Sequence, residues 1–478
     1  MLQSGLEIWR DFLFTFLNDK HLKFLSLAKP RLGFCTISLY TFFNQKIMKE
    51  SIQNKLQQSQ QSFKKWKQIP FEERQKYFAK LSEILRARKQ KFGEIITQEM
   101  KKPISQSISE IEKCSTLCDY YAVAKNVLKP EKIHTEFQIS EVHHEPLGAI
   151  LGVMPWNFPF WQAIRFAVPA ILAGNTVILK HASICLKSGD TLQEIFEEAG
   201  FPDGVFLHFE ISHSEIEEMI ANPIIKGVSL TGSEAAGRKI AETAGKNLKK
   251  CVLELGGSDA FVVCEDANLV KAAENAAIGR LQNCGQTCIA SKRFIIHEKV
   301  FDSFLFLLLK NFKKYEIGDP NDVKTNFSEM AREDLANDLE KQHQTALENG
   351  AEYILPLERI SKAGFKPGIL KMNEENPIND EELFGPLAMV YSGESDEKLL
   401  EIANDTMFGL GNSIWTSDEN RALFFAKNLE SGTVSINQTT KSDVRLPFGG
   451  TKNSGYGTEL SLYALHEFVS KKTIIGNL

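Results

Sequence analysis

Three side chains in the sequence are of the types needed for nucleophilic catalysis at a carbonyl group: Cys288, Glu254 and Asn157. Cys288 ends the segment QNCGQTC (residues 282–288), in which Asn, Gly and Gln favour a loop whose backbone amides can face a negative charge. A polar, reachable loop of this kind suits a reactive thiolate. Free cysteines are also common in protein cores, so Cys288 by itself leaves a purely structural role open.

Glu254 lies near the end of an apolar strand pattern, and Asn157 follows another one. Glu254 lies between two leucines, where a charged carboxylate is costly to bury. This predicts a raised pKa and a role as a general base, although a buried ion pair would explain the same pattern. Asn157 lies in the loop segment MPWNFP, and its neutral amide could stabilise an oxyanion or hold a turn.

The elements around these residues alternate between strand and helix patterns, which predicts a parallel, doubly wound sheet. Strands are expected at residues 148–154, 176–180, 205–209, 227–230, 251–255 and 259–263. Helices are expected at 161–172, 188–199, 212–221 and 234–244, with a helical region at 49–125 and a further helix at 272–281 before the cysteine loop. A second alternation predicts another α/β domain, with helices near 299–315 and 329–349 and strands near 352–355, 387–391 and 411–416.

The composition excludes several classes of function. A net charge of −5 argues against a nucleic-acid-binding surface. Eight cysteines without a disulfide framework or signal peptide indicate a reduced, cytoplasmic protein, and their spacing does not complete a zinc site, so no metal is expected. Residues 1–47 are rich in Phe and Leu, but their uncharged runs are too short to span a bilayer, so no membrane partner is expected. Because Met48 opens a polar helical pattern, residues 1–47 are interpreted as an atypical extension that need not be native.

Six motifs occur in one order along the chain. They are PWNFP (155–159), LTGS (230–233), LELGG (253–257), GQTC (285–288), ELFGP (382–386) and PFGG (447–450). From about Ser51 onward this series resembles the aldehyde dehydrogenase superfamily. The resemblance implies NAD(P)-dependent oxidation of an aldehyde to a carboxylate through a thioester on Cys288. It also implies that the Asn157 amide and the Cys288 backbone N–H hold the oxyanion, and that Glu254 activates the hydrolytic water.

The same resemblance implies how the coenzyme is bound. The expected cofactor-binding residues are Pro155, Trp156, Lys180, Ser183, Gly232, Ser233, Glu382 and Phe384. In the family, the counterpart of Lys180 binds the ribose of the adenosine half, and those of Glu382 and Phe384 contact the nicotinamide half. Ser183 stands where many NAD-preferring members carry Glu, so a 2′-phosphate should not be repelled and NADP should be admitted as well as NAD.

The fold implied by the resemblance is α/β, with a Rossmann-like cofactor domain, an α/β catalytic domain and a small β oligomerisation flap. We expect the cofactor domain at residues 48–127 and 147–256, and the catalytic domain at 257–445. The flap and the C-terminal segment are expected at 128–146 and 446–478. Family members are usually dimers or tetramers, so a homodimer or homotetramer is expected.

Arg165 suggests which aldehyde is used. It lies about two helical turns after Asn157 among apolar residues, where an unpaired guanidinium would be costly. A guanidinium suits a carboxylate, and Arg at this position resembles the bacterial succinate-semialdehyde dehydrogenases, with Ser442 as a second contact. Pairing of Arg165 with a structural acid is the alternative. The expected reaction is oxidation of succinate semialdehyde to succinate, and the alternative is a general aldehyde dehydrogenase of broader aliphatic specificity.

Two rival functions are compatible with the same fold. A catalytically silent structural or binding protein is disfavoured because Cys288, Glu254 and Asn157 are all present. A CoA-dependent acylating enzyme is disfavoured by Glu254, since it would not need to activate water. Cys284 is a separate question: it could form a reversible disulfide with Cys288, or simply fill space in the loop.

Overall fold

The computed structural model describes residues 52–478. Residues 55–478 belong to one unit, which is the part considered below. The prediction that residues 1–47 form an atypical extension concerns a segment outside the described residues. Within the described range, no helix combines the length and the apolar character needed to cross a membrane.

Helices open the unit, as the sequence predicts. Residues 55–66 are helical, followed by α3 (Phe71–Ala87), α4 (Lys89–Met100) and α5 (Ile104–Ala122). Pro70 and Pro103 stand directly before α3 and α5, where a missing backbone N–H costs no helical hydrogen bond. Acidic Glu72 and Glu73 lie in the first turn of α3, where they complement the helix dipole.

The first large sheet carries the coenzyme motifs. Its strands are β3 (Ala149–Met154), β4 (Thr176–His181), β5 (Phe206–His208), β6 (Ile225–Thr231), β7 (Lys250–Glu254) and β19 (Gly455–Tyr456). Their order is β19-β7-β6-β3-β4-β5, with β19 antiparallel to β7 and all other neighbours parallel. The chain builds outward from β3 to β5 and then returns to the other side of β3 with β6. The topological switch point, where ligands bind in such sheets, therefore lies between β3 and β6.

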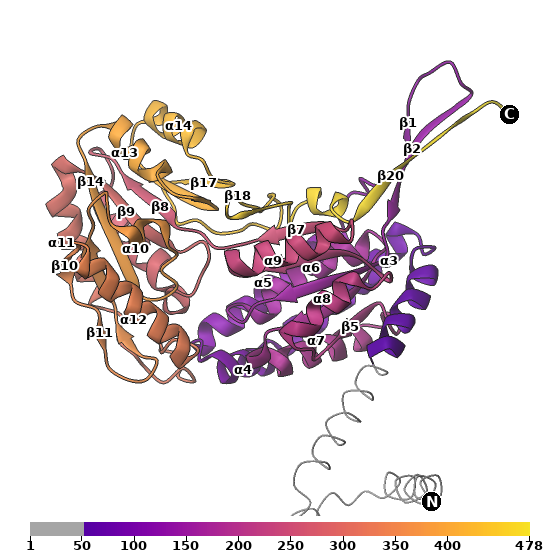
Figure 1. Cartoon of the computed structure of the whole chain (residues 1–478), viewed down its shortest axis with the longest axis horizontal. Coiled ribbons are helices and arrows are strands. Elements are labelled where there is room, and N and C mark those ends of the chain that lie inside the picture. Colours follow the sequence, from indigo (N-terminus) through magenta and orange to yellow (C-terminus); the bar gives the residue numbers. More distant parts are fainter. Residues whose placement is uncertain (1–51) are drawn as a thin grey trace, which may run out of the picture. The chain divides into compact units, whose positions relative to one another are not determined.

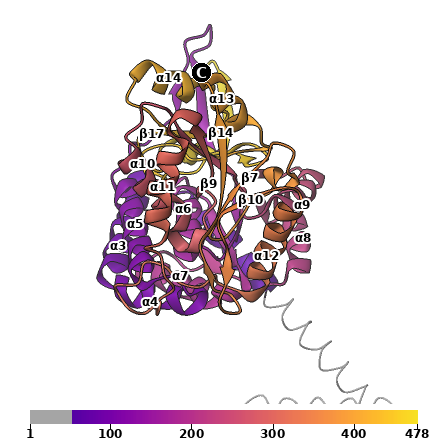
Figure 2. The same ribbon diagram turned by 90° about the vertical axis from the view of Figure 1, so that its left-hand side faces the viewer.

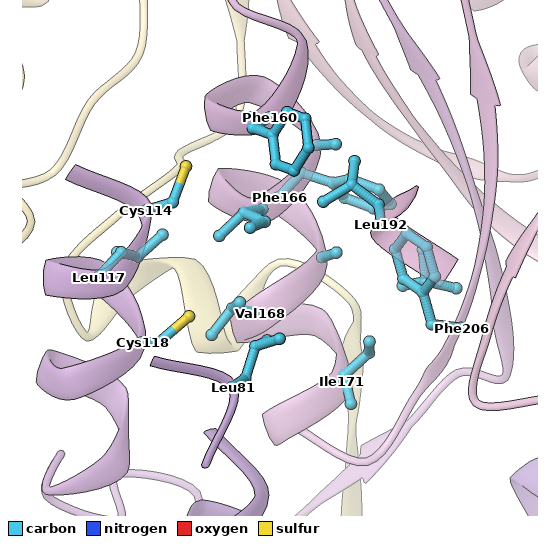
Figure 3. Packing of buried hydrophobic residues seen from close by; sticks show 14 of the residues in the cluster. Leu81, Cys114, Leu117, Cys118, Phe160, Phe166, Val168, Ile171, Leu192 and Phe206 are labelled. Carbon is cyan, nitrogen blue, oxygen red and sulfur yellow. The ribbon is translucent and has the colours of Figure 1, made fainter. Parts of the chain in front are cut away.

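Helix α6 (Pro159–Leu172) is the most enclosed element beside this sheet. The other helices are α7 (Leu186–Glu198), α8 (His213–Ala221) and α9 (Glu234–Lys246). All residues of α6 are buried, including Arg165. Figure 3 shows Cys114 and Leu117 of α5 on one side of α6, and Leu192 and Phe206 on the other. Because its whole circumference is packed, α6 can hold a polar side chain only if that side chain finds a partner inside the protein.

The second large sheet carries the cysteine loop and the ELFGP motif, each directly before one of its strands. These strands are β8 (Asp259–Val263), β9 (Ser291–His297), β10 (Glu352–Leu355), β13 (Gly368–Lys371), β14 (Leu387–Gly393), β16 (Gly411–Trp415) and β17 (Thr433–Ile436). Their order is β10-β13-β14-β9-β8-β16-β17, and only β10 is antiparallel to its neighbour. The helices are α10 (Leu269–Leu281), α11 (Phe301–Phe312), α12 (Glu333–Glu348), α13 (Asp396–Asn404) and α14 (Glu419–Asn428). Figure 2 shows α10 and α11 on one side of β9 and α12 on the other.

The predicted order of the main strands and helices is confirmed, but several short elements were not predicted. The sequence analysis assigned no element to β13, β17, α13 or α14, which span 4, 4, 9 and 10 residues. Short segments show few periods, so a helix and a strand are harder to separate there, although β10 and α8 are equally short and were predicted.

A third, antiparallel sheet combines the segment after α5 with the C-terminus. It contains β1 (Glu131–Lys132), β2 (Ile139–Pro146) and β20 (Val469–Gly476), in that order. Eight residue pairs, from Ile139–Gly476 to Pro146–Val469, align β2 with β20. These strands extend together away from the helices of the first sheet (Figure 1).

Gly152→Ala is expected to lower the melting temperature, because a β-carbon on this β3 residue would lie 2.2 Å from the buried ring of Phe166. Overpacking of this kind costs roughly 1–3 kcal/mol. Gly245→Ala in α9 is the control: its methyl group would meet no atom within 4 Å and should raise stability by roughly 0.4–1 kcal/mol. Thermal unfolding at one protein concentration compares the variants. Equal melting temperatures would contradict the close packing of β3 against α6.

Candidate active site

The predicted motifs meet between the two large sheets. Asn157 follows β3, Gly232 follows β6 and Glu254 ends β7, so these residues lie at the carboxyl ends of first-sheet strands. Cys288 precedes β9 and Glu382 precedes β14, so they lie at the amino ends of second-sheet strands. A cavity of about 590 Å³ lies where these ends face each other. Its lining includes Pro155, Trp156, Asn157, Gly232, Ser233, Cys288, Glu382 and Phe384.

A second cavity of about 290 Å³ adjoins the first and shares Pro155, Trp156, Thr231 and Gly232 with it. Lys180 and Ser183 also line this second cavity. Three predicted site residues line neither cavity: Glu254, Arg165 and Ser442.

The loop that presents Cys288 has an unusual backbone. Asn283, Cys284 and Gly285 have successive positive φ angles of 53°, 54° and 74°. Two non-glycine residues in this region store strain, so their surroundings must hold them in place. Asn283 donates its backbone N–H to the Gln106 side chain at 2.9 Å. At Gly285, a β-carbon would lie 2.4 Å from the carbonyl oxygen of Gly385, so only glycine fits.

Cys288 is half-buried and lines the larger cavity. Burial raises the pKa of this thiol to about 11, although the positive charges of Arg165 and Lys292 oppose the shift. The resting side chain is therefore a thiol at neutral pH, and its proton has to be removed before it attacks a carbonyl group.

Lys292 is a candidate functional residue that was not identified from the sequence. It is fully buried on β9 and donates to the carbonyl oxygens of Thr287 at 3.1 Å and Cys288 at 2.6 Å. Its ammonium also lies 3.0 Å from a Glu382 carboxylate oxygen. Lys292 thus connects the nucleophile loop to a predicted coenzyme ligand. A lysine four residues after the nucleophile, directly before a strand pattern, is the sequence signal that could have identified it.

Asn157 is positioned by a network of amide groups. Its side-chain Nδ2 donates to the Gln286 carbonyl oxygen at 2.9 Å, and its own carbonyl oxygen accepts from Asn283 at 3.0 Å. The Gln286 side chain is itself held by a hydrogen bond from the Ala331 backbone N–H at 2.9 Å. An amide nitrogen carries two hydrogens, so Asn157 keeps one donor available for a ligand in the cavity.

Glu254 is buried, and neither of its carboxylate oxygens has a hydrogen-bond partner among the described residues. Burial, followed by the negative charge of Glu459, raises the pKa of Glu254 well above its usual range, while Arg165 opposes the shift. A carboxylate whose pKa is raised can accept a proton from water more readily than an ordinary carboxylate.

Arg165 forms an ion pair with the buried carboxylate of Glu459. Its guanidinium also donates to the Thr231 hydroxyl at 3.3 Å and lies 4.8 Å from the centre of the Phe448 ring. This corresponds to the alternative weighed from the sequence, in which Arg165 pairs with a structural acid. Contact of Arg165 with a substrate stays a prediction. Glu459 was not predicted as a site residue, because it lies outside every recognised motif.

Ser442 lies beside a different cation. Its hydroxyl oxygen accepts a hydrogen bond of 2.6 Å from Lys113 of α5. The Lys113 ammonium also lies 4.3 Å from the centre of the Trp161 ring. Lys113 is a second functional candidate that the sequence analysis missed, because α5 carries no motif.

Several of the residues predicted to bind the coenzyme contact one another or the start of α9. Trp156 and Phe384 make an edge-to-face contact with ring centres 5.8 Å apart, and Glu382 accepts from the Gly257 N–H at 3.1 Å. Ser233 caps α9 by accepting from the Ala236 N–H at 3.4 Å. At Gly232, the backbone is not left-handed, and a β-carbon would meet nothing closer than 3.5 Å. Packing inside the protein therefore does not require a glycine at this position. Close approach of a phosphate group to the start of α9 would require it.

Cys284 and Cys288 are both free thiols in different surroundings. Cys284 is buried in the core of the second sheet, whereas Cys288 packs against the core of the first. Burial also raises the pKa of Cys284, which disfavours its reactive thiolate form. The disulfide hypothesis stays a prediction.

Comparison with known proteins gives a consistent result. Residues 43–474 match the aldehyde dehydrogenase family. The chain is 41% identical over 429 residues to the succinate semialdehyde dehydrogenase [NAD(P)+] Sad of Escherichia coli, covering 89% of this chain and 93% of that protein. It is 37% identical over 455 residues to the succinate-semialdehyde dehydrogenase [NADP(+)] of Deinococcus radiodurans, covering 94% and 95%. The structure of succinic semialdehyde dehydrogenase from Streptococcus pyogenes with NADP+ superposes with a TM-score of 0.86 at 38% identity, covering 89% of this chain and 94% of that one. The chain belongs to the aldehyde dehydrogenase family.

Proposed function

We propose that this enzyme uses NAD or NADP to oxidise succinate semialdehyde to succinate through a thioester on Cys288. The observation that carries the chemistry is the convergence of Cys288 and Asn157 on one cavity, with Glu254 buried on the adjoining strand end. The substrate is supported by relatives named succinate-semialdehyde dehydrogenases at 37–41% identity. A general aldehyde dehydrogenase is the alternative, because Arg165 already has a carboxylate partner.

The arrangement supports a reaction in two stages. In the first, Cys288 loses its proton and its sulfur bonds to the aldehyde carbon, while the Asn157 amide and the Cys288 backbone N–H hold the resulting oxyanion. Bound NAD(P) supplies the hydride acceptor that makes this step an oxidation. In the second, Glu254 takes a proton from the water that attacks the thioester, which releases the carboxylate and restores the thiol.

Both coenzymes are expected to bind because Ser183 is neutral. The cavity that Ser183 lines also contains Lys180, Lys239 and Arg332. Lys239 and Arg332 are paired with nearby acids, but Lys180 has no ion pair among the described residues. An unpaired ammonium beside a neutral serine can attract a 2′-phosphate, whereas a glutamate in place of Ser183 would repel it.

The same proposal includes the assembly and the domain assignment. The cofactor domain would comprise residues 48–127 and 147–256, the catalytic domain 257–445, and the flap with the C-terminal segment 128–146 and 446–478. We propose a cytoplasmic homodimer or homotetramer in which the β1-β2-β20 sheet contacts another subunit. Exposed apolar side chains on this sheet support that role, since Ile474 and Ile475 are 37% and 59% exposed.

The wild-type enzyme should prefer succinate semialdehyde to butanal, which has the same carbon count but no carboxylate. We expect a ratio of kcat/KM values of at least about tenfold, with both NAD and NADP, because a tenfold ratio requires only about 1.4 kcal/mol of differential binding. Initial rates of coenzyme reduction measure it. Equal kcat/KM values for the two aldehydes would support the general aldehyde dehydrogenase instead.

Glu254→Gln should separate the two stages. Coenzyme reduction should still occur once per active site, as a burst, and steady-state turnover should then fall by roughly 10²–10⁴-fold because no base activates water. Rapid mixing followed by mass spectrometry should detect the acyl group on Cys288. Cys288→Ser is the control and should show neither burst nor turnover. Wild-type turnover in Glu254→Gln would remove Glu254 from the deacylation step.

The rate of alkylation of Cys288 in the coenzyme-free enzyme should keep rising at pH values above the pKa of an ordinary thiol. Its pKa is raised to about 11, so the thiolate fraction should grow about tenfold per pH unit up to that value. Iodoacetamide labelling between pH 7 and 10, with Cys288→Ala subtracted as background, measures this dependence. A labelling rate that levels off near pH 8 would show that the thiolate forms without help from a base or ligand.

A further inference from the structure

Lys292 is a buried lysine at the point where the cysteine loop meets the segment that carries Glu382. Its side chain is fully buried, so its ammonium has to find its partners inside the protein. It donates to the carbonyl oxygens of Thr287 at 3.1 Å and Cys288 at 2.6 Å, and it forms an ion pair of 3.0 Å with Glu382 Oε1. An ammonium has three N–H donors, and these three contacts match that number. Lys292 therefore acts through its neighbours, not as a ligand-binding group of its own.

The contact with Thr287 orients the backbone N–H of Cys288. The Thr287 carbonyl and the Cys288 N–H belong to one peptide unit, which is planar, and no cis bond occurs in the described residues. In a trans unit the C=O and N–H bonds point in opposite directions. Lys292 and the Ala290 N–H, which donates to the same Thr287 oxygen at 3.1 Å, thus fix the direction of the Cys288 N–H. This N–H is the backbone donor of the proposed oxyanion site.

The contact with Glu382 orients a carboxylate that lines the larger cavity. Its Oε1 is held from two sides, by the Lys292 ammonium and by the Gly257 N–H at 3.1 Å. Its Oε2 forms no hydrogen bond within the described residues, and a β-carbon at Gly256 would overlap it. One oxygen is therefore fixed by the protein, and the other is available to accept hydrogen bonds from a ligand such as a ribose diol.

Arg280 of α10 holds the backbones of the same two segments together. Its guanidinium donates to the carbonyl oxygens of Gly285 at 3.4 Å, Leu383 at 2.8 Å and Leu387 at 2.9 Å. The ELFGP segment is thus fixed against the cysteine loop through its backbone by Arg280 and through the Glu382 side chain by Lys292. A change at Lys292 should therefore affect Glu382 and the cysteine loop while the backbone contact through Arg280 persists.

We propose that Lys292 is a positioning residue that couples the coenzyme site to the nucleophile, by holding the Glu382 carboxylate for the coenzyme and the Cys288 N–H for the oxyanion. This inference rests on the proposed function and on the predicted role of Glu382 as a coenzyme ligand. The ammonium has a further effect on the thiol. Burial raises the pKa of Cys288, and Lys292 is, after Arg165, the second positive charge that opposes this shift.

Lys292→Met, which keeps the length of the side chain and removes its donors, should weaken coenzyme binding without any aldehyde present. We expect the Kd for NADP and for NAD to rise at least about tenfold, because Glu382 loses the group that orients it. Calorimetric titration of the aldehyde-free enzyme measures this change. Iodoacetamide labelling of Cys288 without coenzyme should slow at least about threefold at pH 8.5, because the thiolate loses a nearby cation. An unchanged Kd in the folded variant would overturn the inference.

A double-mutant cycle separates positioning from a purely structural role. Glu382→Gln should itself raise the coenzyme Kd. If Lys292 acts on the coenzyme through Glu382, the double variant Lys292→Met/Glu382→Gln should bind coenzyme within about twofold of the weaker single variant. Losses that multiply in the double variant would mean that the two residues act independently, which would overturn the inference.

Two further variants keep the test decisive if Lys292→Met does not fold. Lys292→Gln keeps two N–H donors in the buried site and should lie between wild type and Lys292→Met in coenzyme Kd; a wild-type Kd would contradict the proposal. Glu382→Gln changes a side chain that is 19% exposed, and it should accelerate labelling of Cys288, because the charge of Lys292 is then no longer balanced. An unchanged labelling rate there would also contradict it. Thermal unfolding shows which variants are folded.

Steady-state rates add a readout that distinguishes positioning from substrate recognition. In Lys292→Met, kcat/KM for succinate semialdehyde and for butanal should fall by the same factor, because both aldehydes form the same oxyanion. A loss confined to one aldehyde would assign Lys292 to substrate recognition and overturn the inference. Lys299→Met is the control: Lys299 follows β9, is exposed and pairs with Glu265 at 2.6 Å, so its loss should change neither Kd nor labelling.

The coenzyme measurements also separate this inference from the proposed function. If the wild type binds coenzyme but oxidises neither aldehyde, the proposed function is wrong, and the coenzyme Kd of Lys292→Met still decides the role of Lys292. If the wild type oxidises succinate semialdehyde and Lys292→Met keeps the wild-type Kd and labelling rate, only the role of Lys292 is wrong.

Discussion

The buried ion pair between Arg165 and Glu459 is the interaction on which the active site depends. Arg165 lies on a helix that is packed on all sides, so its charge can be accommodated only by an internal partner. Glu459 comes from the C-terminal segment, which pairs with Phe448 through an isolated bridge and lies against Ser229 of β6. The pair therefore joins α6, the first sheet and the C-terminal segment at one point. Removing either partner would leave an uncompensated charge there.

This pair also sets the electrostatic conditions of the catalytic groups. Glu459 raises the pKa of Glu254 while Arg165 lowers it, so the environment of the proposed base depends on both members of the pair. Arg165 likewise opposes the effect of burial on Cys288. Lys292 donates to two carbonyl groups of the nucleophile loop and contacts Glu382. The site thus places a protonated thiol and an unbonded carboxyl group near two cations, so that proton movement is needed at each stage of the reaction.

The two large sheets explain why these groups meet. The first sheet contributes its carboxyl strand ends, where the backbone turns towards helix N-termini and suits a pyrophosphate. The second sheet contributes the loops before its strands, among them the strained loop that carries Cys288. A nucleotide-binding crevice and a nucleophile loop are therefore opposed across one cavity. The lining of this cavity therefore comes from both sheets.

The sequence by itself determined the order of the main strands and helices, the family, and the candidate nucleophile, because these depend on local patterns. Apolar periodicity identifies β3 and α6, and a strand-turn-helix motif carries its chemistry within a few residues. Several short elements, such as β13 and α13, were not predicted. Only the tertiary structure decided which charges are paired. Lys113 and Ser442 are 329 residues apart, and Arg165 meets Glu459 from a distant segment. Such pairs arise from the packing of separate elements, whereas a sequence pattern reports neighbours within one element. For this reason the sequence could single out Arg165 as a polar residue that needs a partner, but the fold had to show that this partner is already present.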